Sequence, residues 1–163
     1  MILQIVGFKN SGKTTLMTHT IKLLKAHDLT VATIKHHGQH QRDFQDNDIT
    51  LQKDHVDHMK HFHAGADQSI VQGNLYQQTV TRTEKQSLDE IINESVTIDN
   101  NIILVEGFKN AGFDKVAVYT DEDERKSLGK LSNVQYYMKM NDINAMEQYD
   151  NWLLTYFKIK GMH

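Results

Sequence analysis

The stretch Leu3-Gln4-Ile5-Val6-Gly7-Phe8-Lys9-Asn10-Ser11-Gly12-Lys13-Thr14-Thr15 decides the fold of this chain. The part from Gly7 to Thr14 fits the pattern G-x-x-x-x-G-K-[ST] of a Walker A phosphate-binding loop. Apolar residues precede the pattern as in a strand, and residues 16–26 after it have the spacing of an amphipathic helix. Strand, glycine-rich turn and helix in this order are the context that the motif requires. The stretch therefore predicts a nucleotide-binding loop.

The residue types in this loop match the chemistry of a triphosphate. Glycines at Gly7 and Gly12 allow a tight turn that directs backbone N–H groups at phosphates near the positive end of the helix. Lys13 is expected to reach the β- and γ-phosphates, and the Thr14 hydroxyl to bind Mg²⁺. We predict that the nucleotide contacts come from Gly7, Asn10, Ser11, Gly12, Lys13, Thr14 and Thr15.

The order of the apolar segments predicts an α/β protein. A strand, a helix and a second strand at 31–34 form a βαβ unit, which implies parallel strands with right-handed crossovers. Further strands are expected at 69–71, 77–81, 102–106, 116–119 and 134–140, and further helices after Ser87 and at 144–157. We predict one P-loop NTPase-like domain over residues 1–163, with three layers and a largely parallel central sheet that leaves room for antiparallel edge strands.

Two later strands are expected to bring side chains to the edge of the sheet that carries the loop. Lys35 and His36 follow the second strand, and we predict that both contact the nucleotide. The strand at 102–106 ends on Glu106, which resembles the acid of a Walker B element. Glu106 is therefore predicted as the catalytic residue and, with Thr14, as the site of Mg²⁺.

Three other segments have distinct compositions. The sequence Gly-Phe-Lys-Asn-Ala-Gly at 107–112 nearly repeats that at 7–12, and both loops are expected to line one cleft. The segment at about 38–63 is polar and rich in Asp and His, and it is expected to be mobile. His58 and His61 could share one helical face there and hold a metal ion. The charge run at 121–126 is expected to be a solvated turn.

Composition excludes several classes of function. The net charge of −3 and a pI near 6.3 argue against a nucleic-acid surface, because binding to phosphate backbones needs clustered Lys and Arg. There is no cysteine and no long apolar run, so we expect a cytoplasmic protein without disulfides or membrane spans. None of the three arginines, Arg42, Arg82 and Arg125, lies in a finger motif, which predicts weak hydrolysis.

Together these motifs resemble the MobB family. The resemblance rests on Gly7 to Thr15, Ile34-Lys35-His36, Ala64-Gly65-Ala66 and Leu104-Val105-Glu106-Gly107-Phe108-Lys109. It implies a GTP- and Mg²⁺-binding accessory protein of molybdopterin-guanine dinucleotide biosynthesis, a weak GTPase at most. The implied partners are the nucleotidyltransferase MobA, a second copy of the chain and, as a further ligand, molybdopterin. Asp57 falls near an Asp of the family pattern, and residues 40–55 depart from that pattern.

Two alternatives use the same loop. A small-molecule kinase would need a base at an acceptor hydroxyl and usually a lid with arginines, which are scarce here. A nucleotide-dependent metallochaperone GTPase would explain the histidines but lacks Cys ligands. The residues by themselves do not separate GTP from ATP, since no Asn-Lys-x-Asp signature is present. Lys139, Asn141 and Asp142 are the nearest groups with suitable chemistry.

Overall fold

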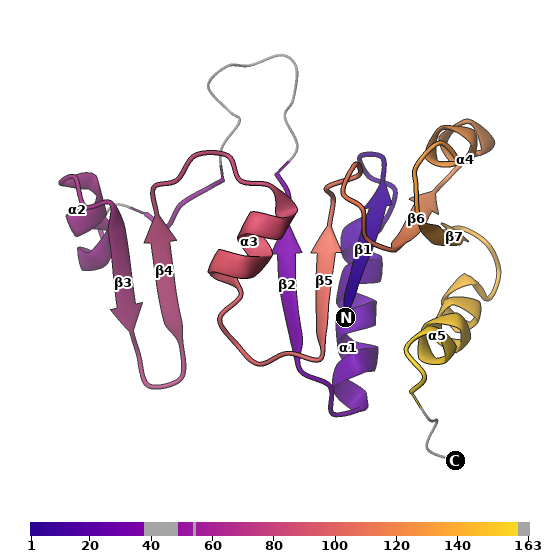
Figure 1. The fold of residues 1–163 in the computed structure, drawn as a ribbon, viewed down its shortest axis with the longest axis horizontal. Helices are drawn as coiled ribbons and strands as arrows, with labels where there is room; N and C mark the ends of the chain where they lie inside the picture. Colours follow the sequence, from indigo (N-terminus) through magenta and orange to yellow (C-terminus); the bar gives the residue numbers. More distant parts are fainter. Residues whose placement is uncertain (38–48, 54, 160–163) are drawn as a thin grey trace. The chain divides into compact units, whose positions relative to one another are not determined.

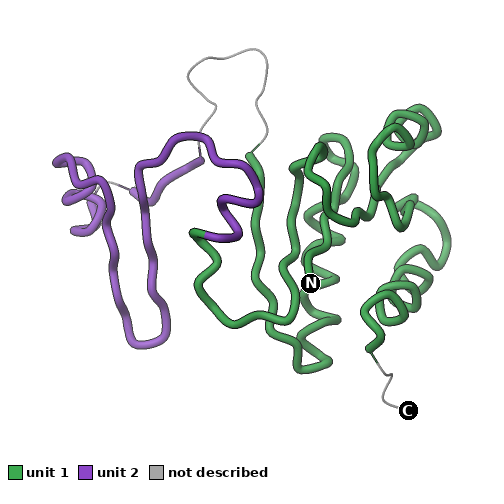
Figure 2. The backbone as a smooth tube through the Cα atoms, in the orientation of Figure 1, with its two compact units in different colours: residues 1–38, 94–163 green, residues 39–93 purple. Residues whose placement is uncertain are grey.

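The computed structural model describes residues 1–37, 49–53 and 55–159. The chain divides into two compact units, one formed by Met1–Gly38 and Glu94–His163 and the other by Gln39–Asn93 (Figure 2). Unit 1 contains the glycine-rich loop and most of the helices. In chain order, unit 2 is an insertion between the second and the third strand of the sheet of unit 1.

Unit 1 is built on a five-stranded parallel sheet. Its strands are β1 (Ile2–Gly7), β2 (Val31–Lys35), β5 (Ile102–Glu106), β6 (Lys115–Tyr119) and β7 (Val134–Lys139). Their order is β2-β5-β1-β6-β7, so the strand before the glycine-rich loop lies at the centre (Figure 1). In this register Glu106 pairs with both Ile5 and Lys35. The carboxyl ends of β1, β2 and β5 therefore meet at one edge.

Helices cover both faces of this sheet because its strands are apolar on both sides. Helices α1 (Lys13–Ala26) and α5 (Ala145–Tyr156) pack with Ile5 and Val118 in the main core cluster. Helix α4 (Glu122–Leu128) buries Leu128 against Val6 and Ala117, which alternate with those residues along the same strands. Because successive strand residues point to opposite faces, the arrangement has three layers.

Unit 2 contains a short helix and a hairpin. Helix α2 (Asp57–His63) packs on β3 (Gln68–Gln72), which pairs antiparallel with β4 (Gln77–Thr81). Helix α3 (Leu88–Ser95) follows and contains the boundary between the units. The Ser87 hydroxyl and the Glu90 carboxylate cap this helix reciprocally, which confirms the predicted capping box.

The predicted fold class is confirmed, with two differences in detail. The antiparallel strands form a sheet of their own and are not edge strands of the central sheet. The charge run at 121–126 was wrongly expected to be a turn, since residues 122–128 form α4 and the Asp121 carboxylate caps its first N–H groups. Residues 57–63 of the segment expected to be mobile form α2, and residues 38–48 and 54 lie outside the described residues, so the mobility of this segment stays a prediction. No helix in the described ranges is long and apolar enough to cross a membrane.

Candidate functional site

The glycine-rich loop joins β1 to α1 at the centre of the sheet of unit 1. Asn10 and Gly12 have positive φ angles of 62° and 92°, and Ser11 N–H donates to the Phe8 carbonyl over 3.3 Å. A Cβ atom at Gly7 would lie 2.5 Å from the Val118 carbonyl oxygen. The loop therefore requires glycine at Gly7 for close packing and at Gly12 for its backbone conformation.

Two side chains of this loop fit an anionic ligand. The Ser11 hydroxyl is buried and has no hydrogen-bond partner in the described part of the chain. Lys13 Nζ folds back onto the Phe8 carbonyl. Burial lowers the pKa of Lys13 below its ordinary value of 10.5; Glu106 opposes this shift, and Lys109 and Lys35 reinforce it. An orphaned hydroxyl and a crowded ammonium group at a helix N-terminus favour the binding of phosphate groups.

Thr14 and Glu106 come together as the sequence predicts. Thr14 Oγ1 lies 3.3 Å from Glu106 Oε1 and 3.2 Å from Oε2, and Lys35 Nζ lies 3.3 Å from Oε1. Glu106 is only 7% exposed, so these two groups are the polar neighbours of a carboxylate that is largely shielded from solvent. A hydroxyl and a carboxylate at this distance fit Mg²⁺, which usually takes one or two protein oxygens and completes its shell with phosphates and water.

The repeated loop at 107–112 lies beside the first, and the single cleft that both are expected to line stays a prediction. Ala111 N–H donates to the Phe108 carbonyl over 2.9 Å, in the same turn that Ser11 and Phe8 make. Gly107 has a φ angle of 101°, and Lys109 Nζ lies 4.4 Å from the centre of the Phe8 ring. Lys115, the first residue of β6, is buried, and its Nζ donates to the carbonyls of Ala111 and Phe113. Unlike the first loop, the repeated loop leads into a strand, so it offers no helix N-terminus to a phosphate.

The remaining predicted positions also lie at this edge of unit 1. The His36 ring is 4.5 Å from that of Phe108, centre to centre, and His36 N–H donates to the Glu106 carbonyl. Asn10 lies in the loop and Thr15 in the first turn of α1, and both are exposed. The structure thus brings Gly7 to Thr15, Lys35, His36 and Glu106 to the carboxyl edge of three neighbouring strands.

Two residues in this region were missed from the sequence. Gln4 is buried within β1, and its amide donates to the carbonyls of Gly107 and Phe108 over 3.0 and 2.8 Å. A polar residue inside an apolar strand was the available signal. Met140, which follows β7, lies against the loop: its side-chain carbons are 2.9 Å from the position of a Cβ atom at Gly12. No sequence pattern indicated this contact, because it depends on the strand order.

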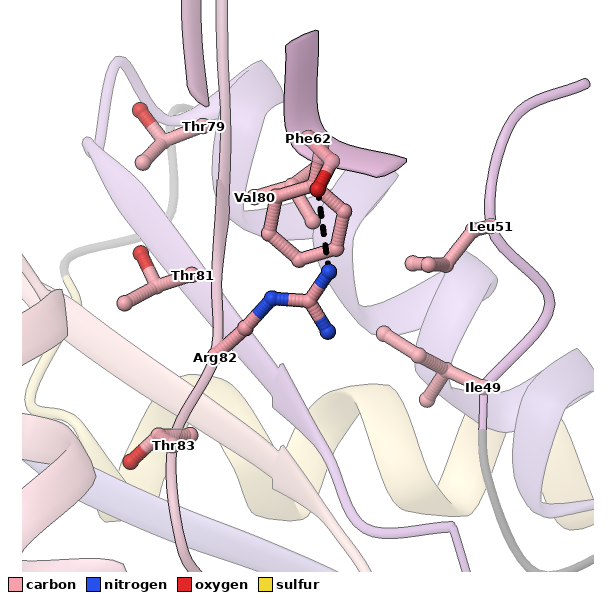
Figure 3. A pocket seen from close by; sticks show the side chains of 8 residues that line it. All are labelled: Ile49, Leu51, Phe62, Thr79, Val80, Thr81, Arg82 and Thr83. Carbon is pink, nitrogen blue, oxygen red and sulfur yellow. Dashed lines mark hydrogen bonds between the residues drawn. The ribbon is translucent and has the colours of Figure 1, made fainter. Parts of the chain in front are cut away.

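Unit 2 has a pocket of its own, with a volume of about 440 Å³ (Figure 3). It is lined by Ile49, Leu51, Phe62, Thr79, Val80, Thr81, Arg82 and Thr83. Arg82 donates to the Phe62 carbonyl over 2.9 Å and stacks on the Phe62 ring. Its guanidinium group is therefore engaged in holding α2 to β4.

The histidines of α2 do not form a metal centre with other described residues. His58 Nε2 lies 2.8 Å from Gln52 Oε1. Within residues 1–37, 49–53 and 55–159, no three His, Cys, Asp or Glu side chains are grouped to hold a metal ion. Residues 38–48, which include part of the histidine-rich segment, lie outside the described residues.

The parallel sheet, the loop between β1 and α1 and the acid at the end of β5 define a P-loop NTPase-like α/β protein. Residues 2–138 match the family model of MobB, described as molybdopterin guanine dinucleotide synthesis protein B. The chain belongs to the MobB family.

Individual relatives agree with this assignment. A probable molybdopterin-guanine dinucleotide biosynthesis adapter protein of Bacillus subtilis is 31% identical over 127 residues, which are 78% of this chain and 69% of the relative. The corresponding adapter protein of Haemophilus influenzae is 32% identical over 123 residues, 74% of this chain and 64% of the relative. Part of that relative's length therefore has no counterpart in the alignment.

Solved structures share the fold over almost the whole chain. The crystal structure of a MobB homologue from Bacillus stearothermophilus superposes with a TM-score of 0.74 at 23% identity, covering 98% of this chain and 99% of that one. Bacillus subtilis MobB superposes with a TM-score of 0.70 at 27% identity, covering 99% of each chain.

Proposed function

We propose that this chain is an adapter protein of molybdopterin-guanine dinucleotide biosynthesis that binds GTP and Mg²⁺ through residues 7–15. The adapter role follows the names of its relatives and its membership of the MobB family. The observation that best supports nucleotide binding is the pairing of Thr14 with Glu106. It lies beside the Ser11 hydroxyl, which is buried and has no partner among the described residues. These groups have the chemistry of a metal-triphosphate site.

Each residue has a distinct part in this proposal. The loop N–H groups and Lys13 hold the phosphates, and Lys13 leaves the Phe8 carbonyl to do so. Thr14 and Glu106 hold Mg²⁺, which neutralises charge on the phosphates. Lys35 holds the Glu106 carboxylate in place through its ion pair.

Hydrolysis at this site is proposed to be weak. Arg82 binds the Phe62 carbonyl, and the Arg125 guanidinium carbon lies 3.3 Å from the centre of the Tyr137 ring. Both arginines of the described residues thus have structural roles, and Arg42 lies outside the described residues. An arginine at the γ-phosphate accelerates hydrolysis by orders of magnitude. Because the described arginines are engaged elsewhere, we expect the isolated protein to hydrolyse bound GTP slowly.

The proposal includes two protein partners. One is a nucleotidyltransferase of the MobA type, which would join GMP to molybdopterin while this chain holds GTP nearby. The other is a second copy of the chain. The hairpin of unit 2 supports self-association because Ile70, Leu75 and Tyr76 are 56%, 84% and 81% exposed.

Reconstitution of the complete reaction tests the adapter role. The purified nucleotidyltransferase, molybdopterin, GTP and Mg²⁺ are combined with wild-type protein, with Lys13→Ala or with the control Lys22→Ala on the exposed side of α1. We expect wild type and the control to raise the rate of dinucleotide formation equally, and Lys13→Ala to raise it much less. Equal stimulation by all three proteins would overturn the role of the loop, and no stimulation by wild type would overturn the adapter role.

A further inference from the structure

The position of Thr14 and Glu106 in the sheet indicates the direction in which a bound triphosphate would lie. In a site of this kind Mg²⁺ would accompany the terminal phosphates, away from the base. Thr14 and Glu106, which would hold the ion, and Lys35, which pairs with Glu106, lie towards β5 and β2, on one side of β1. Strands β6 and β7 lie on the other side of β1 (Figure 1). We therefore expect the nucleoside to extend over their carboxyl ends.

The segment after β7 lies beside the loop on that side. Met140 contacts the backbone at Gly12, and its N–H donates to the carbonyl of Tyr119, the last residue of β6. The chain then turns, with Asp142 N–H donating to the Lys139 carbonyl over 3.2 Å. The Asp142 side chain is 59% exposed and lies 3.7 Å from Lys139 Nζ. The turn that carries the Asp142 carboxylate thus directly follows the residue that contacts the loop, on the side where the base is expected.

Two other carboxylates near the end of β6 are engaged in the fold. Asp121 accepts hydrogen bonds from the N–H groups of Asp123 and Glu124 at the start of α4. Glu124 accepts from both the N–H and the hydroxyl of Thr120. Within the described residues, the side-chain interaction shown for the Asp142 carboxylate is a long ion pair in its own turn, so it has acceptor capacity for a ligand.

A carboxylate distinguishes the two common purines by its hydrogen-bonding edge. Guanine presents the N1–H and the exocyclic amino group side by side, and both donate to the two oxygens of one carboxylate. Adenine presents an acceptor nitrogen and a C–H group at the same positions, which leaves a carboxylate unpaired and repelled. A site built around such donors rejects a base that lacks them.

We propose that Asp142 reads the guanine base of the bound nucleotide, and that this chain selects GTP over ATP through it. Lys139 orients the carboxylate, and Met140 and the 87% exposed Ile143 supply apolar surface for the faces of the base. The inference rests on the proposed function, since it requires a nucleotide in the loop at residues 7–15. Asp142 would then be the group that separates GTP from ATP, a distinction that the residue pattern by itself does not make.

Substitution of Asp142 by Asn changes the base preference in a defined direction. An asparagine side chain accepts from N1–H and donates from its amide, which matches xanthine, where a carbonyl replaces the amino group of guanine. We expect Asp142→Asn to bind GTP about 10- to 100-fold more weakly than wild type, as for loss of a charge-assisted pair. It should bind XTP more tightly than wild type does. The matched control is Asp123→Asn, which removes a 97% exposed carboxylate on α4 and should change neither affinity.

Calorimetric titration of the full chain with GTP, ATP and XTP in the presence of Mg²⁺ separates the outcomes. A wild type that prefers GTP and an Asp142→Asn variant that gains XTP affinity support the assignment. If wild type prefers GTP but the variant keeps that preference, or weakens all three nucleotides equally, the role of Asp142 is overturned while the proposed function stands. If wild type binds GTP and ATP alike, the selectivity assigned to Asp142 is overturned while nucleotide binding by the loop stands. If wild type binds no nucleotide, the proposed function itself fails.

Discussion

Substitution of Gly7 by Ala tests whether the loop depends on the close packing that the structure shows. A Cβ atom at this position would lie 2.5 Å from the Val118 carbonyl oxygen and 2.5 Å from Ser11 Oγ. Gly7 is paired with Val118 in the parallel register of β1 and β6, and Val118 is fully buried. The oxygen of a central strand cannot move away without disturbing the sheet.

The expected magnitude follows from this distance. Ordinary van der Waals contact begins at 3.4 Å, so the backbone at Val118 or at Gly7 must shift by about 0.9 Å. Overpacking of this kind costs about 1–3 kcal/mol. Because Ser11 is displaced as well, we expect Gly7→Ala to lose most of its nucleotide affinity in addition to stability.

Urea denaturation and nucleotide titration of the same samples measure both effects. The control is Gly112→Ala in the repeated loop, where an added Cβ meets no atom of the described residues within 4 Å. This control should stay within about 0.5 kcal/mol of wild type. A Gly7→Ala variant as stable as the control and with unchanged nucleotide affinity would refute the packing argument.

Two further predictions concern stability. Burial raises the pKa of Tyr149 well above its ordinary value of 10.0, although its hydrogen bond with Thr20 opposes the shift. The folded state therefore holds this proton more tightly, so the free energy of unfolding is at its full value below about pH 10 and falls at higher pH. Tyr149→Phe should cost about 1 kcal/mol at neutral pH and flatten the alkaline decline, and an equally steep decline in the variant would contradict this. In unit 2, Arg82→Ala removes the donors to the Phe62 and Ala66 carbonyls and should lower local stability by about 1–3 kcal/mol. Hydrogen exchange should then become faster in β3 and β4 but not in β1, and unchanged exchange in the hairpin would show that Arg82 does not hold it.

Much of the fold was predictable because its signals are local. The strand before Gly7, the loop and the helix after Lys13 appear together in one short stretch, and the structure has all three. The capping box at Ser87 was likewise complete within four residues. Glu106 was predicted at the loop because the carboxyl ends of parallel strands meet at one edge of a sheet.

The features that were missed depend on contacts between distant residues. The charge run at 121–126 looks solvated, yet α4 forms there because Asp121 caps it and Leu128, beyond the run, is buried against Val6. The separate β3-β4 sheet and the position of β5 next to β1 follow from packing that no short pattern encodes. Met140 follows β7, and its contact with Gly12 depends on the strand order β1-β6-β7, which brings the end of β7 to the side of the loop.

The binding of GTP by residues 7–15 is the central claim, and calorimetric titration with Mg²⁺ tests it most directly. Wild type is titrated with GTP and with ATP, and Lys13→Ala is titrated with GTP, with Lys22→Ala as the control for removal of a lysine from α1. The account predicts GTP binding by wild type and the control, weaker binding of ATP, and a loss of at least about tenfold in GTP affinity on removal of Lys13. Equal affinity for GTP and ATP, or unchanged GTP affinity in Lys13→Ala, would contradict it.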